Sequence, residues 1–448
     1  MIGLILLIIG VIAFQYKKYV LALMIVLSFV SSGFRLLSDS LLGIKNEDLA
    51  LGLVFVWALL SKNFKLKYEN IKKTYTYKLI VGFSLFLVFS FIFSLLHYEF
   101  SLVQVIQGGR QYFVILLFFI LIKIDAKYIK FILLKPVFYI TILVAILYIA
   151  QVVTSIPILP SPSNDEISID SSTGIARFYN SPLYLKFYLY ALCLVPNLFE
   201  IKFKKLIIVI LLLSLFCTQG RTNIGTTIAI LFWGLIIQNK YGRLMKYSMI
   251  GCMIVLPFAD LITSRLEGNN TDGDIENVLD GSFIQLVKHQ GSPEGTLEYR
   301  MAWTYERFAY LIGRPIGEQF FGLGMISDSQ PIVVRKYNFF YGLTNSATNR
   351  PYQLATPDIS LGDMISKFGF GGTVLLYGIW LSLLVYLYKN RKISSISFVG
   401  FIFILSTIVG SISNNSLAKT SNLIFYIMIF LIVKTEISKQ KPIDTFAV

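Results

Sequence analysis

The chain has 448 residues, of which 55% are hydrophobic and only 15% carry a charge, and its mean hydropathy is +0.69. About a quarter of the residues of an average soluble domain are charged, so this chain lacks the polar surface that a water-soluble protein of its length needs. The net charge of +15 does not indicate nucleic acid as a partner, because the basic residues lie between long apolar segments. The composition therefore predicts an integral membrane protein.

The apolar segments predict an all-α polytopic protein with about 12 to 14 transmembrane helices. The first segment has no basic residue before it and no small-residue cleavage site after it, so we expect a retained span and not a signal peptide. Several segments are shorter than the roughly 20 residues of an upright span and need snorkelling lysines to cross. The predicted spans are 2–14, 19–36, 49–61, 79–96, 112–124, 131–154, 183–199, 205–218, 223–238, 244–260, 365–388, 396–412 and 421–433.

The connections between these spans alternate in charge. One set carries most of the lysines and few acidic residues, as in the lysine-rich connection 62–78. Positive charge marks the cytoplasmic side of a membrane protein. The pattern therefore puts the N-terminus outside and the C-terminus in the cytoplasm.

Arginine is distributed in the opposite way, with most arginines on the predicted outer face. A guanidinium group captures phosphate or carboxylate through two parallel hydrogen bonds, so this enrichment indicates an anion site. The alternative is that the arginines pair with acidic residues of the outer loops. The outer arginines are Arg35, Arg110, Arg177, Arg221, Arg265, Arg300, Arg307, Arg314, Arg335 and Arg350.

Two outer connections are long, 155–182 and 261–364, and the second is too long for a passive connector. Its polar start contains Asp272 and Asp274, which resemble a DxD metal pair. A solvated turn is the better interpretation, because the glycine that a calcium loop needs is missing. With two histidines, and three cysteines that all lie in apolar segments, the sequence indicates neither a metal site nor a cofactor.

The middle of the large loop predicts an amphipathic helix over 294–312, preceded by a serine and a proline and followed by a glycine. Arg300 and Arg307 lie two turns apart on one face of this helix, and Arg314 follows its end. The alternative is a surface helix whose arginines pair with its own glutamates. The segment 320–324 contains two glycines and predicts a turn that brings the backbone close to another segment.

Arg221 lies in a very short turn between two predicted spans, at the N-terminus of the second one. Free backbone N–H groups and the helix dipole favour an anion there. The alternative role for Arg221 is snorkelling to the lipid headgroups. Asp358 and Asp363 lie where the large loop enters the next span, and each is interpreted either as a general base or as a helix-start acid.

The order of these features resembles the bacterial O-antigen polymerase and O-antigen ligase superfamily of polytopic membrane glycosyltransferases. The resemblance covers roughly 170–390. It is carried by Gly174-x-x-Arg177-Phe-x-Asn-x-Pro182, Thr218-Gln-Gly-Arg221-Thr222, Arg300-x-x-Trp303, Gly322-x-Gly324 and an acidic segment before a glycine-rich span. It implies a metal-independent enzyme of the bacterial cytoplasmic membrane that acts on polyprenyl-diphosphate-linked oligosaccharide at the outer face.

The resemblance also implies roles for residues. Arginines of the outer loops hold the diphosphate, here Arg221, Arg177, Arg300, Arg307 and Arg314. A carboxylate then takes the proton of the attacking sugar hydroxyl. Asp358 is the first choice of base, followed by Asp363 and Glu298.

Four functions remain open from the sequence, one of them a non-catalytic assembly scaffold. Ligases of the superfamily carry a histidine where this chain has Asp358, which favours a polymerase over a ligase that transfers glycan to the lipid A core. A flippase or secondary transporter is less favoured, because the charges gather at the outer rim and no repeat relates the two halves. A chain-length regulator protein is left open as a further partner, besides membrane lipid.

Overall fold

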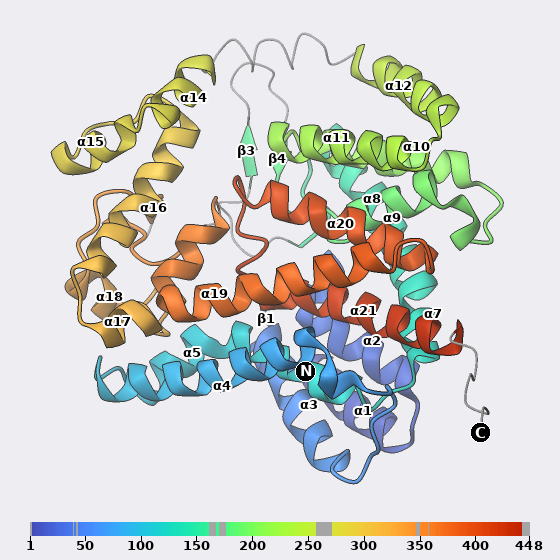
Figure 1. Ribbon diagram of the computed structural model, residues 1–448, viewed down its shortest axis with the longest axis horizontal. Helices are drawn as coiled ribbons and strands as arrows, with labels where there is room; N and C mark the ends of the chain where they lie inside the picture. Colours follow the sequence, from blue (N-terminus) through green and yellow to red (C-terminus); the bar gives the residue numbers. More distant parts are fainter. Residues whose placement is uncertain are drawn as a thin grey trace, which may run out of the picture.

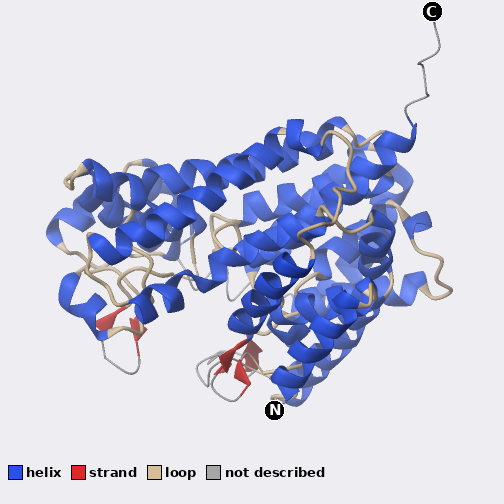
Figure 2. Ribbon diagram, turned by 90° about the horizontal axis from the view of Figure 1, so that it is seen from below, coloured by secondary structure: helices blue, strands red, loops and turns tan. Residues whose placement is uncertain are grey.

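The computed structural model describes residues 2–38, 40–41, 44–160, 167–169, 176–256, 271–345, 350–356 and 358–440. Figure 1 shows a bundle of helices, and Figure 2 shows that helices make up most of the described chain. Short antiparallel strand pairs join β1 (Ser40–Leu41) to β2 (Ile44–Lys45), β3 (Ile167–Ile169) to β4 (Ala176–Phe178), and β5 (Thr344–Asn345) to β6 (Arg350–Pro351).

Each predicted span overlaps a helix of the described chain, although the ends differ, most of all for 112–124, and the end of the predicted span 244–260 lies outside the described residues. The helices before the large loop are α1 (Ile2–Gln15), α2 (Tyr19–Val30), α3 (Asn46–Leu60), α4 (Tyr75–Leu96), α5 (Leu102–Phe113), α6 (Phe118–Leu121), α7 (Ala126–Leu134), α8 (Pro136–Thr154), α9 (Leu185–Leu194), α10 (Lys204–Cys217), α11 (Arg221–Ile237) and α12 (Tyr241–Val255). Those of the loop and beyond are α14 (Thr271–Leu279), α15 (Ser282–His289), α16 (Thr296–Ile312), α17 (Ile316–Phe321), α18 (Pro331–Lys336), α19 (Ser360–Lys389), α20 (Ser395–Gly410) and α21 (Thr420–Gln440).

Five helical stretches in the described part of the chain are long and apolar enough to cross a membrane: Tyr75–Leu96, Leu102–Leu121, Ala126–Thr154, Ser360–Lys389 and Thr420–Lys439. Further apolar helices, α9 and α11 among them, are shorter. The second long stretch begins well before the predicted 112–124, because the 3-10 turn η3 (Val114–Leu117) joins α5 to α6 without a break. The composition and these helices agree on a helical membrane protein.

The outside of the bundle is apolar, as a lipid environment requires. On α4, Leu85, Val88, Phe89 and Ile92 are exposed and follow the three-and-four spacing of one helix face. Water does not tolerate large contiguous surfaces of this kind, whereas acyl chains cover them at no cost.

The large loop folds into helices α14–α18, which lie together at the left of Figure 1, away from the last residues of α21 at the right. The turn predicted at 320–324 fixes this unit to α19. Gly322 and Gly369 both have positive φ and contact each other closely, because a Cβ on Gly322 would lie 2.5 Å from the backbone nitrogen of Gly369. The backbone N–H of Leu323 also donates to the carbonyl of Ser366 at 2.7 Å.

The polar start of the loop differs from its prediction. The solvated turn expected around Asp274 is instead the helix α14, and 267–270 lie outside the described residues. Asp274 is buried and accepts the backbone N–H groups of Leu297 and Glu298 at 2.9 and 2.7 Å. A distant carboxylate therefore caps α16, and the serine that the sequence suggested as its cap lies outside the helix, which begins at Thr296.

Candidate functional site

Arg177 lies in β4, where it is paired with Ser168 of β3. Its guanidinium carbon lies 4.7 Å from the centre of the Tyr179 ring, which fixes the plane of the group. The Nε atom is buried and has no hydrogen-bond partner among the described residues. Arg177 therefore keeps hydrogen-bonding capacity on the inside of the molecule.

The turn between α10 and α11 faces this arginine. Gly220 is the N-cap residue of α11, and no side chain of the described residues caps the helix there. The residue before it, Gln219, has a φ of 52°, a left-handed conformation that costs free energy and is typical of functional turns. Arg221 is the first residue of α11 and is exposed. The turn thus presents free backbone N–H groups and a guanidinium group to an anion.

Asp358 lies between the large loop and α19 and is half-buried. Its backbone N–H donates to the Oγ1 atom of Thr356 at 3.1 Å, and the carbonyl of Thr356 accepts the side-chain amide of Asn415 at 3.0 Å. Burial raises the pKa of Asp358, while the positive charges of Arg300 and Arg177 act on it in the opposite direction. Two predicted site arginines from distant segments are therefore close enough to influence one carboxylate.

Arg300 lies on α16 and is half-buried. Within the described residues its guanidinium group makes no hydrogen bond or ion pair, so its charge is available to a ligand. The alternative interpretation, in which the arginines of this helix pair with its own glutamates, does not hold for Arg300 in the described part of the chain, whereas Arg307 does pair with Glu306. Arg300 and Arg177 are the two arginines that act on Asp358.

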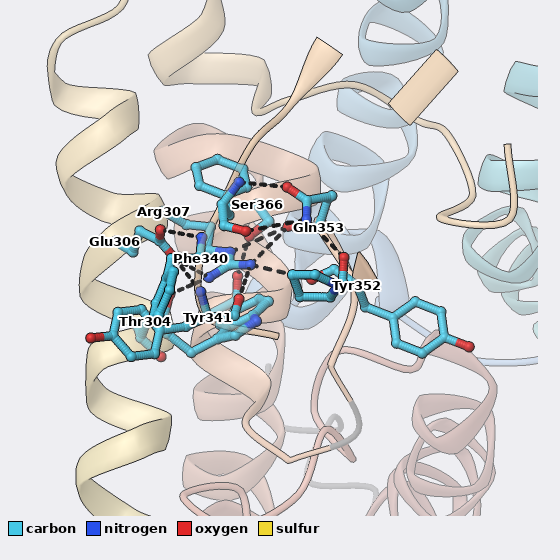
Figure 3. Close-up of polar contacts among 12 residues, drawn as sticks. Thr304, Glu306, Arg307, Phe340, Tyr341, Tyr352, Gln353 and Ser366 are labelled. Carbon is cyan, nitrogen blue, oxygen red and sulfur yellow. Dashed lines mark hydrogen bonds and ion pairs between the residues drawn. The ribbon is translucent and has the colours of Figure 1, made fainter. Parts of the chain in front are cut away.

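Arg307 lies two turns after Arg300 on α16, and its contacts are with other parts of the large loop. Its side chain is fully buried, and Figure 3 shows how its N–H groups converge on the segments that carry Tyr341 and Gln353. It donates to the carbonyl oxygens of both residues and forms an ion pair of 2.7 Å with Glu306. The rings of Trp303 and Phe339 lie 4.0 and 4.5 Å from its guanidinium carbon.

This burial lowers the pKa of Arg307 to about 10, despite the opposing charge of Glu306. All of its donors are directed at the protein, so a diphosphate has no access to it in this conformation. We therefore interpret Arg307 as the residue that holds the large loop together.

Arg314 also has a protein partner, the carboxylate of Glu318. Its Nε and Nη2 atoms bind both oxygens of Glu318 at 2.7 and 3.2 Å, and Glu318 further contacts Nε2 of His97 at 3.0 Å. His97 ends α4, so this ion pair connects the loop to the bundle. The guanidinium group remains partly exposed on its other edge.

The other two carboxylates proposed as bases have protein partners. Glu298 is buried and accepts hydrogen bonds from the hydroxyl of Ser282 at 2.6 Å and the backbone N–H of Glu294 at 2.9 Å. Asp363 is buried on α19 and forms an ion pair of 2.8 Å with Lys367. Of the three, Asp358 is the one on which Arg177 and Arg300 act.

An apolar cavity of about 380 Å³ lies between α15, α16 and α19. Thr304, one turn after Arg300, and Leu361, three residues after Asp358, are part of its wall. The remaining lining residues are mostly aromatic or aliphatic: Phe283, Met301, Tyr305, Phe308, Ile365, Phe370, Thr373 and Val374. An apolar chain attached to an anionic group fits this combination.

Asn415 is a residue of the site that the sequence did not suggest. Its amide holds Thr356, and so the backbone two residues before Asp358. The signal was the polar run 413–416 in an otherwise apolar C-terminal region.

No three histidine, cysteine or carboxylate side chains come together as a metal site within the described residues. Comparison with protein families gives no matching family model, and no curated protein matches the chain significantly.

Proposed function

We propose that this chain is a polysaccharide polymerase of the bacterial cytoplasmic membrane. It transfers glycan from a polyprenyl-diphosphate carrier to a sugar hydroxyl of a second lipid-linked repeat unit at the outer face. The observation that supports the proposal most strongly is that the guanidinium group of Arg177, whose buried Nε atom has no partner among the described residues, borders the uncapped start of α11. The positive charges of Arg177 and Arg300 also oppose the rise that burial causes in the pKa of Asp358. A carboxylate that senses the charge of two arginines is suited to a reaction that releases an anion and consumes a proton acceptor.

In the proposed reaction the bond between the anomeric carbon and the diphosphate oxygen breaks as the acceptor oxygen bonds to that carbon. The electron pair leaves with the diphosphate, and the acceptor proton passes to the carboxylate of Asp358. Arg177, Arg300 and Arg221 stabilise the leaving group together with the uncapped N–H groups of α11. Donors fixed in a site that excludes water stabilise such charge far better than water does.

The apolar cavity beside Thr304 and Leu361 supports a lipid-linked substrate. It begins within a turn of Arg300 and continues along α19 as far as Val374, whose side chain is exposed on the surface of the bundle. An isoprenoid chain is able to lie there while its diphosphate contacts the arginines. A soluble sugar nucleotide has no apolar chain that would fill such a cavity.

The resemblance stated above favours polymerase over ligase through one position, Asp358, where ligases carry a histidine. The two activities differ in the acceptor, since a ligase transfers finished glycan to lipid A core and a polymerase to another lipid-linked repeat.

A glycan ladder gel tests the proposal, comparing a deletion strain with strains that carry the wild-type gene or Asp358→Asn. We expect single-repeat glycan in the deletion and in Asp358→Asn, and a full ladder in the complemented strain. Asp280→Asn is the matched control, because this exposed aspartate lies in the same loop. A full ladder that stays on the lipid carrier would indicate a ligase, and loss of glycan export a flippase. Either outcome contradicts the proposal.

A further inference from the structure

The end of α16, the turn after it and α17 form one edge of the large loop, residues 308–320, all of which the structure describes. Every exposed residue of this edge is apolar, a glycine or a proline: Phe308, Ala309, Ile312, Gly313, Pro315, Ile316 and Phe320. The exposed residues of α14, α15 and the turn between them, in contrast, include Glu276, Asp280 and Lys288. A surface that faces water seldom lacks charge over such a length, so the edge 308–320 is unusual within its own loop.

The polarity of α17 is the reverse of that of a helix in water. Ile316 and Phe320 lie one turn apart on the same face, and they are 83% and 47% exposed. Glu318, which lies between them in the sequence, is 4% exposed and binds Arg314 on the protein side. A helix at a water-facing surface directs its apolar face inward and its charges outward. The apolar face of α17 is instead directed away from the protein.

The contacts of α17 place it beside the apolar part of α4, as Figure 1 also shows at its lower left. The ring centres of Phe320 and Phe86 lie 5.8 Å apart, and a Cβ on Gly317 would lie 3.1 Å from the ring of Phe93. Phe86 precedes Leu96, the last residue of α4, by ten positions, which is about 15 Å along a helix. This length is about half of the roughly 30 Å hydrocarbon core of a bilayer. The edge therefore lies at the level of a membrane-crossing stretch, and not beyond its end.

The polar groups of the turn between α16 and α17 are bonded within the protein. The side-chain amide of Gln319 donates to the carbonyl oxygens of Ile312 and Arg314 at 3.0 and 2.8 Å. After α17, the carbonyl of Gly322 accepts the hydroxyl of Tyr98 at 2.7 Å. Non-helical backbone is tolerated at membrane depth only where the protein supplies such partners. In water, Gln319 would have no need to turn its amide back onto the backbone.

The exposed apolar surface continues from the edge onto the membrane-crossing helices. A Cβ on Gly371 of α19 would lie 2.5 Å from the ring of Phe320, and Val374, one turn further along α19, is 70% exposed. On the other side, Phe86 of α4 is followed by the exposed Phe89. The edge thus lies between two helix surfaces that lipid covers, and the same acyl chains are suited to cover it.

We propose that residues 308–320 are inserted into the acyl-chain region of the leaflet on the side of the large loop. The loop is then partly embedded in the membrane and does not stand entirely in water. The inference does not depend on the proposed glycan transfer. Phe308 also lines the apolar cavity between α15, α16 and α19, so a chain in the bilayer adjoins this cavity without passing through water.

Electron paramagnetic resonance of nitroxide labels tests the insertion. The full-length protein carries a single label at Ile312→Cys or at Ile316→Cys in phospholipid vesicles, with Cys193, Cys217 and Cys252 replaced by alanine. Molecular oxygen dissolves preferentially in acyl chains and a water-soluble nickel chelate in the aqueous phase. We expect oxygen to relax both labels more strongly than the nickel chelate does.

Two further positions serve as matched controls. Phe89→Cys, at an exposed residue of α4, should give the oxygen-dominated result of a lipid-facing site. Asp280→Cys, at an exposed residue of the same loop, should give the nickel-dominated result of a site in water.

Stronger relaxation by nickel at Ile312→Cys or Ile316→Cys would place the edge in water and overturn the proposal. Weak relaxation by both reagents would show that protein covers the edge, which overturns it as well. Thermal melting identifies a labelled variant that fails to fold, and the other position then decides. Glycan transfer by the labelled proteins is a separate measurement, so failure of the insertion and failure of the proposed function are distinguishable.

Discussion

The Nη2 atom of Arg177 lies 3.9 Å from the position that a Cβ atom would occupy on Gly220, the N-cap residue of α11. The guanidinium group of one outer segment and the free N–H groups of another thus border the same space. In the sequence these two features are separated by a whole helical hairpin. Their approach is the basis for the proposed diphosphate site, and the predictions below test the residues around it.

Arg221→Lys should abolish long-chain glycan while the amount of protein in the membrane stays normal. Lysine keeps the charge at the first residue of α11 but cannot form the two parallel hydrogen bonds of a guanidinium group. A glycan ladder gel with an immunoblot measures both quantities. Arg335→Lys, a change at an exposed arginine of α18, is the control. Wild-type chain lengths in Arg221→Lys would remove this residue from the site.

The pH dependence of transfer should report the titration of Asp358. Its pKa lies above the ordinary value because burial outweighs the two arginines, and only the deprotonated form accepts a proton. The rate should therefore rise with pH through this pKa and then level off. Arg300→Gln removes a charge that lowers the pKa, so the rise should move to higher pH.

The measurement is kcat/KM between about pH 4 and pH 8, a range that spans the ordinary carboxyl pKa and values raised above it. Arg335→Gln should leave the profile where it is. A profile that does not move in Arg300→Gln would show that this arginine does not act on the base.

Arg307→Gln should destabilise the protein by about 3–5 kcal/mol, which is the cost of removing one partner of a buried ion pair. The change leaves Glu306 and the carbonyl oxygens of Tyr341 and Gln353 without their donor. Thermal melting in detergent measures the effect, and Arg307→Lys should not restore the melting temperature, because one ammonium group cannot reach all of these acceptors. Arg300→Gln should melt like wild type, and equal losses in the two variants would contradict the separate roles.

The ion pair of Glu318 should make the loop sensitive to acid. Burial raises the pKa of Glu318, but hydrogen bonds from Arg314 and His97 outweigh it and leave the pKa below the ordinary value. A carboxyl whose folded-state pKa is lowered stabilises the protein above its unfolded-state pKa, and the gain is lost as the pH falls through the folded-state pKa. Glu318→Gln should therefore lower the melting temperature at neutral pH and have little effect in strong acid. A difference that does not change with pH would contradict this role.

The sequence predicted the helices well because apolar length is a local property. Every predicted span overlaps a helix of the described chain, and the turn with Gly322 brings the backbone close to another segment as expected. The roles of the arginines, in contrast, depend on contacts with segments that are distant in the sequence. Arg300 and Arg307 share one helix face by spacing, yet the segments that carry Tyr341 and Gln353 enclose only Arg307.

Asp274 is a similar case. Its surroundings in the sequence are polar and typical of a turn, and its partner, the N-terminus of α16, is more than twenty positions away. Arg35 is one of the predicted outer arginines, but the sequence does not signal the left-handed backbone of Ser32–Arg35 that carries it.

The most direct test of the central claim is glycan transfer by the purified protein in lipid nanodiscs, supplied with a lipid-linked repeat unit and a metal chelator. We predict products of two or more repeats on the lipid carrier, one released polyprenyl diphosphate for each bond formed, and a rate roughly 10²–10⁴ times lower for Asp358→Asn. Polymerisation by Asp358→Asn at the wild-type rate, or the absence of any longer product from active wild-type protein, would contradict the account.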